Sequence, residues 1–211
     1  MTASDLYAPA IPELLSLFET EPFDLEKARK IASGIEDVNA PILDVCGYST
    51  TYLYEAQAAN NVQAVALLLE MGADPNYNNP DIDGDCPLWE LQYFSDGRDE
   101  DIKKKEVEAR YQIAKLFFQH GADPDLTLGS ESLYAYVGFR LFEGDEDETG
   151  LELLKNLFKI LIAYGGGTAD GYERIELSSP IDLERIDDYA VALSQKSCQI
   201  IDPEGHVIGS L

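Results

Sequence analysis

The feature that most constrains the fold is a tetrapeptide that occurs twice, each time at the end of an amphipathic run. Residues 61–77 read NVQAVALLLEMGADPNY and residues 113–126 read IAKLFFQHGADPDL, so both contain Gly-Ala-Asp-Pro. A weaker copy upstream, in residues 25–40, places Asp37-Val38-Asn39 where the copy in residues 61–77 has Asp74-Pro75-Asn76. A further copy, KILIAYGGG, retains only the glycine. The positions that correspond to the first residue of the tetrapeptide are Ile35, Gly72, Gly121 and Gly165. Such internal repetition predicts a repeat architecture.

Each unit has the composition of two helices joined by a turn. In the second unit the apolar residues recur at helical spacing, and Gly72 follows the last apolar turn, where a helix end favours a residue that tolerates positive φ. A polar stretch follows, and Pro87 then suits the first turn of a new helix. Residues 48–59 repeat this plan. The sequence therefore predicts a helix-turn-helix repeat.

The stretch GYSTTYLYEAQAANNVQAVALLLEMGADPN, residues 47–76, resembles a nearly complete ankyrin repeat, in which a Thr-Pro-Leu-His-type helix start precedes a second helix ending in Gly-Ala-Asp. The resemblance covers roughly residues 24–167. Tyr52 and Tyr54 stand at the family's Pro and His positions, and Trp89 stands at the His position of the later unit. The resemblance implies an all-α solenoid of about four degenerate repeats with an extended surface for binding proteins.

The two ends of the chain are predicted to be caps. Apolar residues on one face of residues 12–19 indicate that residues 1–23 form an N-terminal helical cap over the repeats of residues 24–167. Residues 168–211 are predicted to form a C-terminal cap. Alternating residues at 189–194, 198–201 and 206–209, separated by turn residues, favour a small three-stranded antiparallel sheet there.

The spacing of the repeats indicates two insertions. The four corresponding positions are 37, 49 and 44 residues apart, against a period of about 33 in the family. About thirteen extra residues fall between the paired helices of each later unit, at Ser95–Arg110 and Phe142–Gly150. Because both segments are polar, we expect them to project into solvent or to meet a partner.

The charge of the chain restricts its partners. Forty Asp and Glu residues face 15 Lys and Arg residues among 211, which gives a net charge of −25, while a hydrophobic content of 45% is enough for a folded core. This field repels polyphosphate, so nucleic-acid binding is excluded, and it attracts a basic protein. The alternative interpretation is that the charge serves only solubility.

No motif for a catalytic, metal or cofactor site is recognisable. Cys46, Cys86 and Cys198 fit neither a disulfide framework nor zinc spacing and suit a reducing cytoplasm. The oxygen-rich run at residues 81–85 lacks the Gly and Glu of a calcium loop, which favours a plain hairpin. No export signal or membrane span is evident. We expect no cofactor and a cytoplasmic location.

The two histidines also have structural interpretations. His120 is predicted to lie at a helix end, and His206 on an exposed strand. An enzyme in the C-terminal tail stays a third alternative, since Cys198 and His206 could face each other across a hairpin.

The candidate partner-binding residues are aromatic and acidic side chains at positions where stacked repeats would present an extended concave surface. Tyrosine and tryptophan are enriched at binding hot spots, although about half of these are expected to pack between repeats. The aromatic candidates are Tyr48, Tyr52, Tyr54, Tyr77, Trp89, Tyr93, Tyr134 and Tyr136. The acidic candidates are Asp81, Asp83 and Asp85, then Asp96, Asp99, Glu100 and Asp101, and finally Glu143, Asp145, Glu146, Asp147 and Glu148.

Together these observations predict a non-enzymatic protein-protein interaction module. The more specific hypothesis is a cytosolic immunity protein that binds and blocks a basic toxin such as a nuclease, because its carboxylates could cover a cationic cleft. The alternative is a generic ankyrin-type adaptor with another protein partner.

Overall fold

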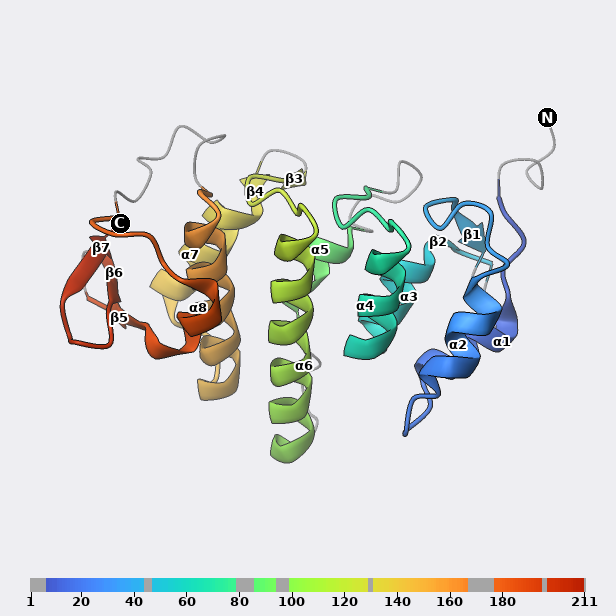
Figure 1. Cartoon of the computed structure of the whole chain (residues 1–211). Coiled ribbons are helices and arrows are strands. Elements are labelled where there is room, and N and C mark those ends of the chain that lie inside the picture. Colours follow the sequence, from blue (N-terminus) through green and yellow to red (C-terminus); the bar gives the residue numbers. More distant parts are fainter. Residues whose placement is uncertain are drawn as a thin grey trace.

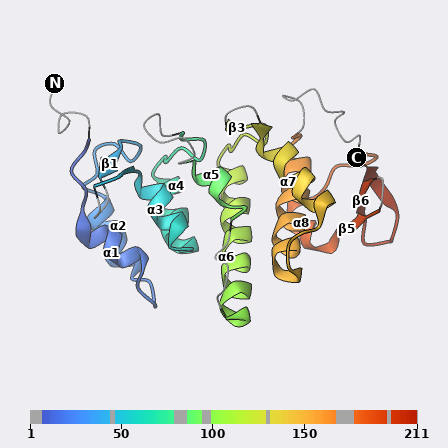
Figure 2. The ribbon, with the colours of Figure 1, turned by 180° about the vertical axis from the view of Figure 1, so that it is seen from behind.

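Helices follow one another in pairs that stand side by side along a row (Figure 1, and from behind in Figure 2). The structure, a computed structural model, describes residues 7–43, 47–78, 86–93, 99–128, 131–166, 177–194 and 197–210. The pairs are α1 (Pro12–Phe18) with α2 (Leu25–Ala32), α3 (Tyr52–Ala58) with α4 (Val62–Glu70), α5 (Pro87–Glu90) with α6 (Glu100–Gln119), and α7 (Leu133–Glu143) with α8 (Glu148–Ala163).

Short antiparallel strand pairs lie along one edge of this row, and a small sheet lies at its C-terminal end (Figure 1). The pairs are β1 (Ile42–Leu43) with β2 (Ser49–Thr50), and β3 (Thr127–Leu128) with β4 (Glu131–Ser132). After η2 (Leu183–Asp188), the strands β5 (Ala190–Leu193), β6 (Cys198–Ile201) and β7 (Val207–Ser210) pair in the order β5-β6-β7. The predicted three-stranded antiparallel tail is confirmed.

Glycine ends the second helix of three successive pairs in the same way. Gly72, Gly121 and Gly165 have φ values of 91°, 89° and 88°. In each case the next residue donates its backbone N–H to a carbonyl of the helix, at 3.0, 3.0 and 2.9 Å. Because a side chain at positive φ would be strained, glycine suits these positions. The prediction that Gly72 follows a helix end is confirmed, and the weak copy at Gly165 behaves like the two strong ones.

Two asparagines connect successive pairs through a repeated set of hydrogen bonds. Asn39 donates from Nδ2 to the Gly72 carbonyl at 3.0 Å and accepts at Oδ1 from the Asp74 N–H at 2.7 Å. Asn76 makes the same two bonds, at the same lengths, to Gly121 and Asp123. The weak upstream copy at residues 37–39 is therefore equivalent in structure as well as in sequence.

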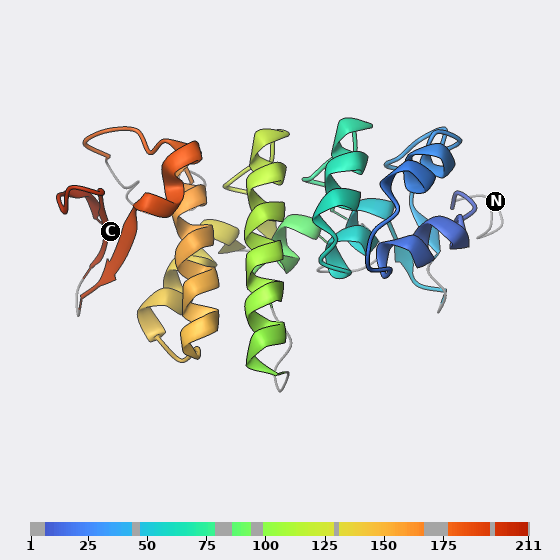
Figure 3. The same cartoon turned by 60° about the horizontal axis from the view of Figure 1, so that its bottom comes forward.

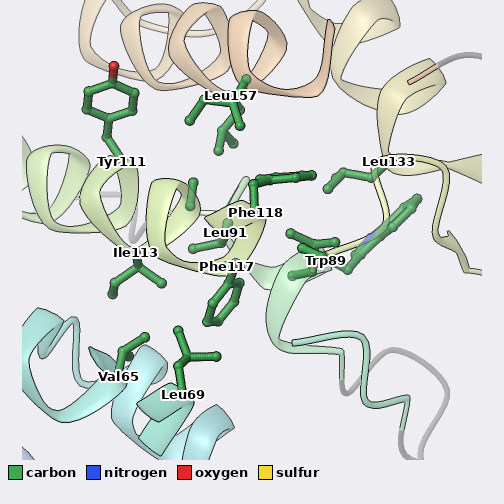
Figure 4. Packing of buried hydrophobic residues seen from close by; sticks show 14 of the residues in the cluster. Val65, Leu69, Trp89, Leu91, Tyr111, Ile113, Phe117, Phe118, Leu133 and Leu157 are labelled. Carbon is green, nitrogen blue, oxygen red and sulfur yellow. The ribbon is translucent and has the colours of Figure 1, made fainter. Parts of the chain in front are cut away.

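A continuous apolar core runs between the helices and joins the pairs. Figure 4 shows Val65 and Leu69 of α4 against Ile113 and Phe117 of α6, with Leu157 of α8 on the other side of α6. All five side chains are buried. Both faces of α6 thus pack against neighbouring helices.

Most described residues of the two polar insertions are exposed, as we expected from the sequence, but much of each insertion is helical. Most of the first forms the start of α6, which extends beyond α4 in Figure 3, and the end of the second forms the first turn of α8. Glu106, Val107 and Arg110 are buried in the first, as are Thr149 and Gly150 in the second. The polar composition of the insertions did not predict this burial, because it depends on the contact between α6 and α8.

We predict that Asn76→Ala lowers the free energy of unfolding by about 1–2 kcal/mol, because it removes two hydrogen bonds between successive helix pairs. The measurement is the urea midpoint at constant m-value. Asn78→Ala is the matched control, since Asn78 is exposed. An equal midpoint for the two variants would show that these bonds do not stabilise the stacking of the pairs.

Candidate binding surface

Three of the aromatic side chains that we predicted to contact a partner are instead buried between helices. Tyr52 lies in the core, where its hydroxyl accepts a hydrogen bond from the Ile11 N–H at 2.9 Å, and burial raises its pKa. Trp89 is buried at the start of the short helix α5. Tyr134 stacks on Phe158, with ring centroids 5.4 Å apart. Tyr52 contacts the preceding helix pair and Trp89 contacts Tyr136 of the following one, whereas Tyr134 packs within its own pair.

Other aromatic side chains are exposed. Tyr48 has 67% of its surface exposed and Tyr93 has 40%, whereas Tyr54, Tyr77 and Tyr136 are half-buried. The outer face of α7 adds two residues that the sequence analysis did not include, Phe139 at 59% and Phe142 at 42% exposed. Their positions could have been found from the helical period, because Leu133, Tyr134, Val137 and Leu141 face the core. From the sequence we selected only tyrosine and tryptophan as aromatic candidates, so these phenylalanines were not included.

Arg140 organises the aromatic side chains on this face of the molecule. Its guanidinium lies 5.9 Å from the ring centroid of Tyr93 and 5.8 Å from that of Tyr136, within cation–π range. It also forms an ion pair with Glu146 and donates to the Gln92 carbonyl at 3.3 Å. Burial and a hydrogen bond with Tyr93 raise the pKa of Tyr136. These contacts connect α5, α7 and the turn before α8.

Several acidic candidates are engaged inside the molecule. Glu146 pairs with Arg140, as described above. Asp147 accepts from Lys103 at 2.8 Å and caps α8 by accepting from the Gly150 N–H, also at 2.8 Å. Glu100 accepts a hydrogen bond from Thr149 at 2.5 Å. These acids therefore join the start of α6 to the start of α8.

The remaining acidic candidates fall into two groups. Asp99, Asp101, Glu143, Asp145 and Glu148 are exposed, and Asp99 caps α6 by accepting from the Asp101 N–H at 2.9 Å. Asp81, Asp83, Asp85 and Asp96 lie outside the residues that the structure describes.

The residues that the structure brings together form what we call the α7 surface. It consists of Tyr93, which follows α5, of the α7 residues Tyr136, Phe139, Arg140, Phe142 and Glu143, and of Asp145. Exposed aromatic rings here stand next to carboxylates. Such a combination suits a partner that offers both apolar and cationic side chains.

A separate groove of about 600 Å³ lies between α6, α8, η2 and β5. Among its lining residues Tyr111 donates a hydrogen bond to Asp187, and burial together with this carboxylate raises the tyrosine's pKa. Lys159 is buried and donates to the Asn156 side chain at 3.0 Å, while its burial lowers its pKa. The groove therefore contains charged groups that are partly removed from water.

The structure does not support a Cys198–His206 dyad. Strand register places Cys198 at the start of β6, opposite Leu193, whereas His206 precedes β7 at the far end of the β6–β7 hairpin. Cys198 is buried, and burial raises its pKa to about 11, which disfavours the thiolate. His206 is exposed and hydrogen-bonds Asp202, and His120 lies at the end of α6 with Nδ1 2.9 Å from the Leu116 carbonyl.

Metal and membrane sites were also considered. In the part of the chain that the structure describes, no group of three or more His, Cys, Asp or Glu side chains is arranged to hold a metal ion. None of the helices formed by the described residues combines the length and apolarity needed to cross a bilayer.

No protein-family model matches this chain, and no curated protein has a significant sequence match to it.

We predict that Asp147→Asn destabilises the protein at neutral pH and that this difference disappears in acid. The substitution keeps a capping oxygen but removes the charge that pairs with Lys103. The hydrogen bond from Lys103 lowers the pKa of Asp147 in the folded state, so the pairing stabilises above the ordinary carboxyl pKa and is lost as the pH falls through the lowered one.

The measurement is thermal unfolding of both proteins across a pH series. Asp145→Asn is the control, because Asp145 is exposed and lies two residues away. A pH-independent difference between wild type and Asp147→Asn would contradict the ion-pair interpretation.

Proposed function

We propose that this chain forms an ankyrin-like helical solenoid of about four degenerate repeats and acts as a non-enzymatic binder of a basic protein. The observation that carries the proposal is the α7 surface, where exposed Phe139, Phe142 and Tyr93 stand beside the carboxylates of Glu143 and Asp145.

The repeat part of the proposal is supported by equivalent contacts in successive units. The same asparagine makes the same two bonds at two junctions, and three helices end on glycine with nearly the same φ. In repeat proteins each unit contacts its neighbours and the stack presents an extended surface. The row of helix pairs in Figure 1 is consistent with this arrangement.

The binding part is supported by the composition of the α7 surface and by the charge of the chain. Large aromatic groups supply much of the energy of protein interfaces and are enriched at hot spots. Arg140 holds the Tyr93 and Tyr136 rings in place before a partner arrives, which reduces the entropy lost on binding. A net charge of −25 would accelerate the encounter with a cationic protein.

The most specific form of the proposal is a cytoplasmic immunity protein that blocks a toxin such as a nuclease. A nuclease needs a cationic cleft to hold phosphates, and exposed carboxylates such as Glu143 and Asp145 would occupy or cover that cleft. The aromatic residues would then anchor the complex while the charges set its association rate.

We predict that Phe139→Ser with Phe142→Ser weakens binding of the natural partner at least about tenfold, because it removes two exposed aromatic anchors. Wild type and variant are used to capture proteins from cells that naturally produce this chain, and the captured proteins are compared by quantitative mass spectrometry. The matched control is Leu43→Ser with Val207→Ser, which removes two exposed apolar side chains elsewhere.

The proposal expects a basic protein that is lost with the α7 variant and retained with the control. With that protein purified, the association rate should fall as ionic strength rises. Blocking of its enzymatic activity would support the immunity hypothesis. A neutral or acidic partner whose binding is insensitive to salt would instead favour a generic adaptor, and capture that is unchanged by the α7 variant would refute the role of this surface.

A further inference from the structure

The groove between α6, α8, η2 and β5 is bordered by the open edge of a β-strand. The sheet order β5-β6-β7 leaves β5 with a partner on one side only, and Tyr189, Ala190 and Val191 line the groove. An unpaired strand edge presents a row of backbone donors and acceptors that can pair with another extended chain. Figure 1 shows β5 at the C-terminal end of the row of helices, beyond α8.

The hydrogen-bond alternation of the sheet shows which groups of β5 face outward. The Ser194 N–H donates to the Ser197 carbonyl at 2.9 Å, so this pair is of the hydrogen-bonded type. Because hydrogen-bonded and non-hydrogen-bonded pairs alternate in an antiparallel ladder, Val191 and Leu193 direct their N–H and C=O groups away from β6. Among the residues that the structure describes, none pairs with that side of β5.

The charge of the groove is predominantly negative. Its charged lining residues are Glu108, Glu148, Glu152 and Asp187 on one hand and Lys155 and Lys159 on the other. Glu148 and Glu152 are exposed and form no ion pair with a described residue. They lie four residues apart on α8, where like charges repel. A cationic side chain placed between them would relieve that repulsion.

One lysine of the groove, Lys159, could also bind the main chain of an added peptide. Lys159 is buried, and its ammonium group makes one hydrogen bond, to Asn156, out of the three that an ammonium can donate. An added peptide would offer carbonyl oxygens, which such a donor can bind. Tyr111 and Asp187 also line the groove, and Asp187 lies 4.0 Å from the ammonium group of Lys115.

We propose that β5 accepts an extended, lysine- or arginine-rich peptide segment of a protein partner as an additional strand, with its cationic side chains against Glu148 and Glu152. Alternate side chains of an added strand point to the same face, so every second residue would reach the groove. This site differs in its residues and binding mode from the α7 surface, and it stands whether or not that surface binds a partner.

The test uses a short synthetic peptide in which lysine alternates with valine, and a second peptide that is N-methylated at alternate residues so that one edge cannot pair. Binding of the first peptide should slow hydrogen exchange at the Val191 and Leu193 amides. N-methylation should weaken binding at least about tenfold, because it removes backbone hydrogen bonds.

Protein variants separate the charge contribution from strand pairing. We expect Glu148→Gln with Glu152→Gln to weaken binding of the unmodified peptide about fivefold, as the loss of two exposed ion pairs would. The matched control, Glu26→Gln with Glu36→Gln, makes the same charge change at exposed positions far along the chain and should leave binding unchanged. Equal binding of both peptides, protection of other amides instead, or no binding of the unmodified peptide would overturn the proposal.

Discussion

The interaction on which the rest of the structure depends is the pair of hydrogen bonds that one asparagine makes to the next helix pair. A helix end leaves carbonyl and N–H groups without partners within the helix, and at two junctions Asn39 and Asn76 satisfy one of each. The positive φ of the glycine turns the chain so that these groups face the asparagine. Because both junctions use the same geometry, successive pairs are held in similar orientations, and the apolar faces of α4, α6 and α8 meet as one core.

The second constraint is the pairing of the few basic side chains of this acidic chain with neighbouring carboxylates. Lys103 binds Asp147, Arg140 binds Glu146, and Arg110 binds Glu106, so basic residues stabilise the long helices from within. These pairs neutralise the carboxylates nearest to them. Glu143 on α7, Asp145 in the following turn and Glu148 on α8 stay exposed.

The sequence could locate some of the exposed candidate residues but not all of them. Tyr93, Glu143 and Asp145 were predicted from their positions in the repeats and in a polar insertion, and they are exposed. Tyr52, Trp89 and Tyr134 were predicted in the same way, yet they are buried between helices, since a tyrosine or tryptophan is amphipathic enough for either place. The groove beside β5 had no local signal, because its residues come from three segments about thirty to eighty positions apart in the sequence.

By itself, the sequence determined the paired helices, the glycines that end three of them and the three-stranded tail, because each depends on local periodicity and on residues with distinct backbone preferences. The tertiary structure alone decided that the polar insertions would lengthen α6 and α8, and which aromatic rings would be buried. Those outcomes depend on the face that each helix turns toward its neighbours. Burial of a polar residue such as Glu106 or Arg110 is favourable only when a partner from the fold compensates for its lost hydration.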